Sequence, residues 1–135
     1  MATTRMSEAG PAGREATTIN PSISDSEIQR RDALTGRLLQ SCVETVEFFS
    51  VYLGHRLGLY RTLADIGPVT SSELAMRAGT DERTTREWLE QQAAAGNLDV
   101  DNPSADAGAR RYGLSPGHGE VFVNRDSLSH PVVLP

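Results

Sequence analysis

The sequence predicts a mainly α-helical winged helix-turn-helix domain with a long N-terminal helix and a two-stranded antiparallel wing. Three observations carry this prediction: two capping boxes that begin helices, glycines placed to end them, and a run of turn formers between two short strand-like segments. In a capping box, a Ser or Thr and the Glu three residues later satisfy each other's backbone N–H groups. Glycine ends helices because it adopts a left-handed backbone without a Cβ penalty.

The first capping box, Ser24–Glu27, predicts the start of a long amphipathic helix. Beyond it, apolar side chains recur every three or four residues, which indicates one apolar stripe. The stripe consists of Leu34, Leu38, Leu39, Cys42, Val46, Phe49 and Leu53. Within it, we expect Cys42 to be a small buried hydrophobic residue. Gly58 is expected to end this helix, and a short helix over 59–64 should stop at Gly67.

The helix-turn-helix is predicted from the second capping box, Thr70–Glu73, which begins a helix that ends at Gly79. Thr80 is expected to cap the next helix, which ends at Gly96. In that helix, Trp88 and an adjacent leucine should anchor the domain core. Helix, glycine turn, helix and two short strands form the order typical of a winged helix.

The wing is predicted as strands over 98–100 and 111–114, joined by the turn formers of 101–108. Ser115 followed by proline predicts one more short helix over 117–123. The expected organisation is a flexible tail over 1–23, the winged-helix domain over 24–123, and a C-terminal tail or the start of a linker over 124–135.

Composition limits the function classes. The 135 residues carry a formal net charge of −5, and all 13 basic side chains are arginine. A net negative charge disfavours general nucleic-acid binding, which usually requires a basic stripe. Cys42 is the only cysteine, so an intrachain disulfide is impossible. The sequence has no signal peptide pattern and no membrane-length apolar run, so we expect a cytoplasmic protein without a membrane partner.

DNA binding is an alternative that the helix-turn-helix order itself raises. The second helix would enter the major groove and the wing would contact the phosphate backbone. The residues expected at such an interface are Arg83, Thr84, Thr85, Arg86, Arg110 and Arg111. Against this, residues 70–111 carry eight acidic and five basic side chains, a net charge of −3. The competing expectation is a solvated surface where Arg83 and Arg86 pair with Glu87 and Glu90.

No catalytic, metal-binding or cofactor-binding residue is predicted. His55, His118 and His130 are scattered along the sequence, and none has a second ligand at metal spacing or a plausible nucleophile nearby. Surface or capping roles are expected for all three. Gly117–Gly119 lacks the preceding strand that a phosphate-binding loop needs.

Four segments carry a resemblance to a known family: 51–64 (VYLGHRLGLYRTLA), 70–75 (TSSELA), 86–98 (REWLEQQAAAGNL) and 111–116 (RYGLSP). Together they resemble the N-terminal region of bacterial class I S-adenosylmethionine-dependent methyltransferases, over about residues 33–125. In that family a winged-helix domain precedes a Rossmann-like catalytic domain. The domain serves chiefly as a dimerisation platform, and it helps to close the substrate pocket.

The resemblance implies a non-catalytic module. The sequence stops before the family's glycine-rich loop and acidic residue for S-adenosylmethionine, so this cofactor is expected only if a catalytic domain or a separately encoded catalytic subunit supplies its site. The leading expectation is a homodimer that buries Leu38, Val46, Phe49 and Leu53 between two long helices. Packing of this stripe within its own domain is the competing expectation. The alternative function is a winged-helix transcriptional regulator.

Overall fold

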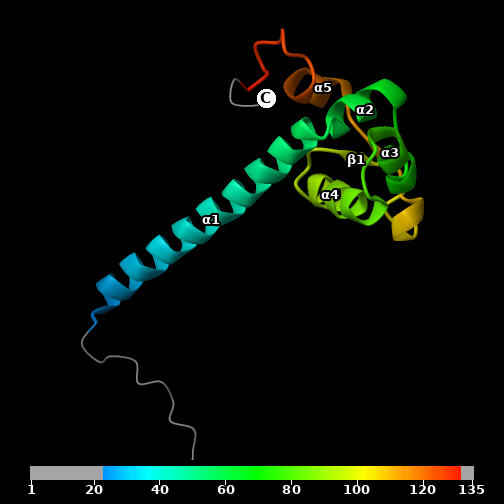
Figure 1. The fold of residues 1–135 in the computed structure, drawn as a ribbon. Coiled ribbons are helices and arrows are strands. Elements are labelled where there is room, and N and C mark those ends of the chain that lie inside the picture. Colours follow the sequence, from blue (N-terminus) through cyan, green and yellow to red (C-terminus); the bar gives the residue numbers. More distant parts are fainter. Residues whose placement is uncertain (1–22, 132–135) are drawn as a thin grey trace, which may run out of the picture. The chain divides into compact units, whose positions relative to one another are not determined.

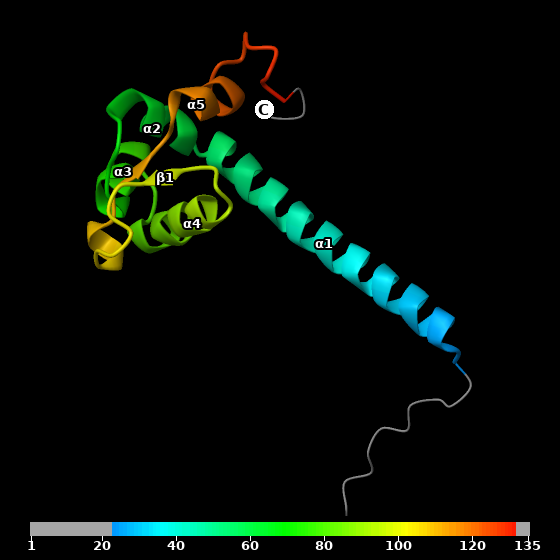
Figure 2. The same cartoon turned by 180° about the vertical axis from the view of Figure 1, so that it is seen from behind.

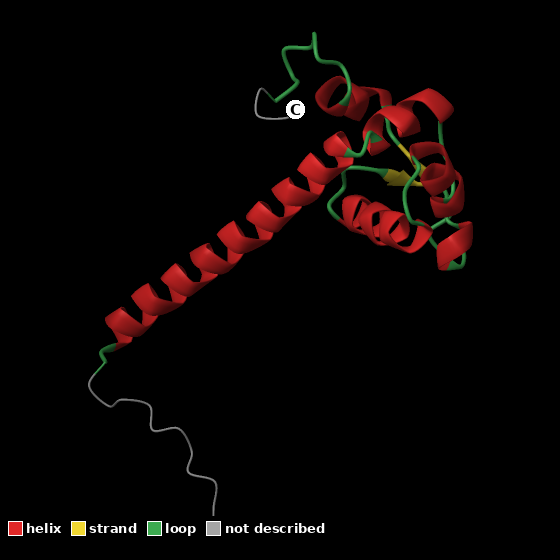
Figure 3. Cartoon of the chain, viewed as in Figure 1, coloured by secondary structure: helices red, strands yellow, loops and turns green. Residues whose placement is uncertain are grey.

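The computed structural model describes residues 23–131, so the tail expected over 1–23 lies outside the described residues up to residue 22, and the one expected over 124–135 does so from residue 132. Five α-helices and a two-stranded sheet follow one another along the chain (Figures 1 and 3). The helices are α1 (Asp25–Arg56), α2 (Leu59–Ile66), α3 (Ser71–Ala78), α4 (Glu82–Ala94) and α5 (Pro116–Phe122). The strands are β1 (Asp99–Val100) and β2 (Tyr112–Gly113), with a 3-10 helix, η1 (Ala107–Ala109), between them. The predicted fold class is confirmed.

Two compact units divide within α1, after Arg37. In the first unit, the described part is the start of α1, where the Glu27 N–H donates to Ser24 Oγ at 3.4 Å. The Glu27 carboxylate accepts a hydrogen bond from Arg30 at 3.0 Å. The second unit, from Leu38 onward, contains the rest of α1 and every other element.

The core of the second unit forms where α2, α3 and α4 pack together. Helix α3 contacts both α2 and α4, and α5 contacts α2 (Figure 2). Leu59, Leu63, Leu74 and Leu89 are all 1% exposed or less. The remaining buried members of this core are Val51, Tyr60, Val69, Trp88, Leu98 and Tyr112. Burial of this apolar surface is the main source of the domain's stability.

The wing is antiparallel, with Asp99 paired to Gly113 and Val100 to Tyr112. The strands are each two residues long, shorter than predicted. Tyr112 has a second backbone partner that the sequence pattern does not indicate. Its N–H donates to the Val69 carbonyl at 2.8 Å, and the Val69 N–H donates back at 3.0 Å. This bridge joins β2 to the residues that lead into α3.

The helices largely end at the glycines that the sequence predicted as their ends. Gly58 has a φ of 70° between α1 and α2, and Gly79 has a φ of 68° after α3. Both angles lie in the left-handed region that favours glycine. Ser115 caps α5 by accepting from the His118 N–H, with Pro116 in the first turn. Proline fits there because its missing N–H has no helical partner.

Candidate functional site

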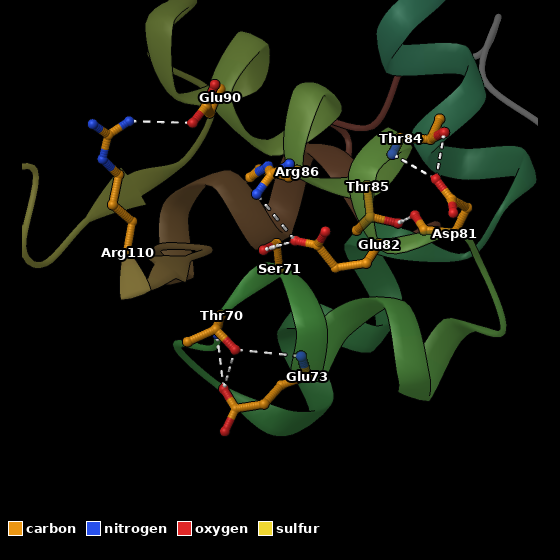
Figure 4. Close-up of polar contacts among 10 residues, drawn as sticks. All are labelled: Thr70, Ser71, Glu73, Asp81, Glu82, Thr84, Thr85, Arg86, Glu90 and Arg110. Carbon is orange, nitrogen blue, oxygen red and sulfur yellow. Dashed lines mark hydrogen bonds and ion pairs between the residues drawn. The ribbon is translucent and has the colours of Figure 1, made fainter. Parts of the chain in front are cut away.

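The helix-turn-helix begins at a complete capping box. The Thr70 N–H donates to the Glu73 carboxylate at 2.8 Å, and the Glu73 N–H donates to Thr70 Oγ1 at 3.3 Å (Figure 4). The bond from the Thr70 N–H, followed by one that the Thr70 hydroxyl donates to the same carboxylate at 3.1 Å, favours the ionised form and lowers the pKa of Glu73 below its usual range. The box therefore fixes a negative charge at the start of α3.

The start of α4 differs from the prediction that Thr80 is its cap. Asp81 caps the helix, and its Oδ1 accepts from both the N–H and the hydroxyl of Thr84 at 2.9 Å. These bonds hold the pKa of Asp81 below its usual range, with the backbone bond contributing most. Thr80 instead hydrogen-bonds through its hydroxyl to the hydroxyl of Thr85 at 2.7 Å. A carboxylate outcompetes a hydroxyl here because it can accept both Thr84 donors at once.

Thr85 lies in the interior of the domain rather than on its surface. Its side chain is only 2% exposed, and its hydroxyl donates to the Asp81 carbonyl at 2.7 Å. Thr84, its neighbour, is exposed, but its hydroxyl is held by Asp81. Two of the side chains expected in a DNA groove are thus occupied within the turn that they help to build.

Arg86 is paired with a carboxylate at helical spacing, but not with the one that was expected. Arg86 lies 3.8 Å from Glu82, one turn earlier in α4, and Glu82 also accepts from the Ser71 hydroxyl at 2.6 Å (Figure 4). Glu90 pairs across to Arg110 of the wing at 3.2 Å. The expected pairing of Arg86 with Glu90 is therefore wrong, because the wing brings a closer cation to Glu90.

The second wing arginine is also engaged. Arg111 lies 3.7 Å from the Glu73 carboxylate, and it donates to the Pro68 carbonyl. It ties the wing to the start of α3. Arg83 remains exposed on the first turn of α4. With most of its arginines paired internally, this face has little free positive charge to offer to a phosphate backbone.

The second half of α1 presents an apolar face. Leu38, Val46, Phe49 and Leu53 are each more than half exposed, with Val46 and Phe49 at 61%. Leu39 and Val43 are as exposed, at 63% and 60%, and Phe48 and Tyr52 are exposed to a smaller extent. Side chains of this kind are usually found in cores, so their exposure as a group on one helix is unusual. From here on, the apolar stripe means the part of this helix that lies in the second unit, residues 38–53 of α1.

Cys42 lies on this face and is exposed, so its expected burial is wrong. The expectation assumed that a neighbouring element of the same domain would cover the stripe. Instead, an apolar recess of about 440 Å³ opens here between α1 and α4, lined by Val43, Val46 and Ala94 among others. Helices α1 and α4 are joined by a hydrogen bond that Trp88 Nε1 donates to the Ser50 carbonyl at 2.9 Å.

Two of the histidines that are scattered in sequence come together in space. His55 at the end of α1 and His130 have ring centroids 5.8 Å apart in a T-shaped arrangement. Both belong to an aromatic group in which Tyr60 stacks on Phe122 with centroids 4.4 Å apart. His118 is part-buried, and its Nδ1 lies 3.0 Å from the Asn97 carbonyl. Sequence spacing gives no signal for a pair of residues 75 positions apart.

The described residues contain no group of three or more His, Cys, Asp or Glu side chains that could hold a metal ion. Within residues 23–131, none of the helices is sufficiently long and apolar to cross a membrane.

The profile of a protein family, the Rv2258c-like winged HTH domain, matches residues 48–124 of this chain. No curated protein sequence matches it significantly. Among solved structures, the chain is similar to N,N-8-amino-8-demethyl-D-riboflavin dimethyltransferase (RosA) from Streptomyces davawensis. The sequence identity is 29%, the TM-score is 0.52, and the match covers 72% of this chain and 25% of RosA.

Weaker likenesses accompany it. Human N-acetylserotonin methyltransferase matches at 15% identity and a TM-score of 0.47, over 77% of this chain and 27% of its own. A MarR protein from Peptoclostridium difficile matches at 21% identity and a TM-score of 0.41, over 81% of this chain and 71% of its own. The chain spans about a quarter of the length of the two methyltransferases.

Proposed function

This chain belongs to the Rv2258c-like winged helix-turn-helix domain family, and on that premise we propose that it is a non-catalytic module that pairs two copies of itself through the apolar stripe of α1. The methyl-transfer chemistry of a RosA-like enzyme would be supplied by a further domain or subunit, and the module would help to close that enzyme's substrate pocket. S-adenosylmethionine would bind to that further part.

The exposed stripe is the observation that carries the proposal. Val46 and Phe49 are 61% exposed, and the recess beside them is lined mainly by apolar atoms of α1 and α4. The apolar side chains of α1 in one copy could insert into the recess between α1 and α4 of the second copy, and those of the second copy into the recess of the first. Such a two-fold arrangement is self-complementary, which is the usual geometry of a homodimer.

Charge and hydrogen bonding support this proposal over DNA recognition. Residues 70–111 carry a net charge of −3, and Arg86, Arg110 and Arg111 already pair with carboxylates of the same domain. A DNA interface would have to break these pairs before it could release counterions from phosphates. The apolar stripe needs no such rearrangement.

Sedimentation velocity over a concentration series is the direct test. We expect the wild-type chain to dimerise at micromolar concentration and Phe49→Glu to raise the dissociation constant by at least about tenfold, because a charge would be buried without a partner. Met76→Glu is the matched control, since Met76 is 76% exposed on α3, outside the stripe. The homodimer would be refuted by a wild-type chain that remains monomeric at about 200 μM, roughly 100 times the micromolar dissociation constant that we expect.

Fluorescence polarisation with duplex DNA at low salt tests the other function. We expect no saturable binding. Saturable binding that Arg83→Ala weakens, with a lower salt dependence, would show that the helix-turn-helix face binds DNA. In that case the proposed function, a dimerisation module, would be wrong.

A further inference from the structure

A small cavity of about 90 Å³ lies at the end of α1, on a part of the domain that the apolar stripe does not include. Three basic side chains from three segments line it: His55 from α1, Arg61 from α2 and Arg125 from the segment after α5. The stacked rings of Tyr60 and Phe122 form another part of its wall. None of the described residues that line it is acidic.

Arg61 is available for a ligand. It is exposed, and within the described part of the chain its guanidinium makes no hydrogen bond or ion pair. Arg86, Arg110 and Arg111, by contrast, each have a carboxylate partner at 3.2–3.8 Å. Carboxylates do lie near Arg61 and Arg125, but Glu120 and Asp126 border the adjoining groove. Glu120 accepts a hydrogen bond there from Asn124 at 2.9 Å.

His55 supplies a second, independent observation. Its Nε2 is buried and has no hydrogen-bond partner among the described residues. Buried polar atoms are rarely left in this state. The groups around the ring include His130, Arg125 and the rings of Tyr60 and Phe122. Burial, followed by the charges of His130 and Arg125, lowers the pKa of His55. Burial therefore favours the neutral ring, and His130 and Arg125 add positive charge beside it.

We propose that this cavity binds a small oxyanion, a carboxylate or phosphate group, held by the guanidinium of Arg61 with Arg125 and His55 beside it. A guanidinium presents paired N–H donors that match two oxygens of such a group. The volume suits a group of a few heavy atoms. A purely apolar ligand is the alternative, but it would leave the positive charges of Arg61 and Arg125 without a counter-charge from the ligand. The proposal does not depend on dimerisation.

The test is a titration of the full chain at pH 6 with sodium phosphate and, separately, with sodium acetate. Binding is monitored by the NMR chemical shifts of the backbone amides. Sodium chloride keeps the ionic strength constant. We expect saturable shifts confined to residues 54–61 and 122–125, and the tighter of the two anions identifies the class of oxyanion. Equal shifts with sodium chloride alone, or no saturation with either anion, would overturn the proposal.

Variants locate the site. Arg61→Gln should weaken binding at least fivefold, whereas Arg77→Gln, an exposed arginine on α3 away from the cavity, should leave it unchanged. His55→Gln should bind the anion more weakly than wild type at pH 5.5, and its affinity should not show the increase on acidification between about pH 7 and pH 5.5 that wild type shows. Equal affinity in wild type and Arg61→Gln rejects the cavity. Phe49→Glu should still bind the anion, so failure of this site and failure of the dimer are distinguishable.

Discussion

Gly54 lies directly against the indole ring of Trp88. A Cβ built on Gly54 would be 2.4 Å from Trp88 Cζ2 and 2.6 Å from Tyr60 Cε2. The absence of a side chain at Gly54 is what allows α1 to approach α4 so closely that Trp88 can donate to the Ser50 carbonyl. Gly54 and Gly58, which are four residues apart, thus have different roles. Gly54 permits close packing, and Gly58 supplies a left-handed backbone.

Gly54→Ala should therefore destabilise the domain, although alanine is the better helix former. Both neighbouring rings are held in the core and cannot move without disturbing it, so overpacking of about 1–3 kcal/mol is expected. Gly36→Ala is the matched control, because nothing lies within 4 Å of a Cβ at that helical position. It should be neutral or stabilising by up to about 1 kcal/mol. Urea unfolding followed by circular dichroism would measure both, and a neutral Gly54→Ala would contradict the packing described.

The capping box at Thr70 predicts coupled changes in stability and titration. Thr70→Ala should cost about 1 kcal/mol, and Thr70→Ser should largely preserve the cap. Because the Thr70 hydroxyl also donates to the Glu73 carboxylate at 3.1 Å, its removal should raise the pKa of Glu73 part of the way to its usual value. In Thr70→Ala the Thr70 backbone N–H still donates to the Glu73 carboxylate, and this bond has the larger effect on the pKa of Glu73.

The sign of the pH dependence follows from this pKa. A carboxylate whose pKa is lower in the folded state contributes stability above its unfolded pKa of about 4.3, and this contribution is lost as pH falls through the folded value. Carbon-detected NMR of the Glu73 carboxylate between pH 2 and 6 would follow it. A Glu73 pKa that is the same in wild type and Thr70→Ala would show that the hydroxyl does not contribute.

Cys42 offers a probe of the apolar stripe without any mutation. It is the only cysteine and it is exposed, so a monomer should react with a thiol reagent at the rate of a model thiol. If two copies pair through the stripe, the rate should fall at least about fivefold as the protein concentration rises through the dimerisation range, in proportion to the dimer population. In Phe49→Glu the rate should be independent of concentration. A wild-type rate that does not change across a concentration range where a dimer is present would place the interface elsewhere.

The local parts of this fold could be predicted from sequence because their causes are local. The box at Thr70, the left-handed glycine at Gly79 and the proline after Ser115 each act within four residues. The start of α4 was placed one residue early because Thr80 and Asp81 are both good caps, and only the positions of the Thr84 donors decide between them.

The contacts that sequence could not supply are those between distant residues. The bridge between Val69 and Tyr112, the pair of Glu90 with Arg110 and the approach of His55 to His130 all depend on how the elements pack. Periodicity identified the apolar stripe correctly, but periodicity reports only that one helix face is apolar. It cannot say whether the same chain or another molecule covers that face, which is why the burial of Cys42 was predicted wrongly.

The packing of His55 predicts a loss of stability on mild acidification. Its pKa is lower in the folded protein than the ordinary 6.5, chiefly because of burial and then because His130 and Arg125 lie near it. The unfolded chain therefore takes up a proton at a higher pH than the folded chain does. The contribution of the neutral ring is present above about pH 6.5 and is lost as pH falls through the folded pKa.

The unfolding free energy should therefore decrease between pH 7 and pH 5, with a slope below the one-proton limit of about 1.4 kcal/mol per pH unit. His55→Gln should flatten the profile in this interval, whereas His118→Gln serves as the control histidine of α5, with its own contact to the Asn97 carbonyl. Addition of phosphate at pH 5.5 should restore part of the wild-type stability, since an anion in the cavity would offset the positive charge of protonated His55. Chemical denaturation at fixed ionic strength would measure all of these effects. A wild-type profile that is flat from pH 7 to pH 5 would show that His55 titrates alike in the folded and unfolded chain, and would contradict this prediction.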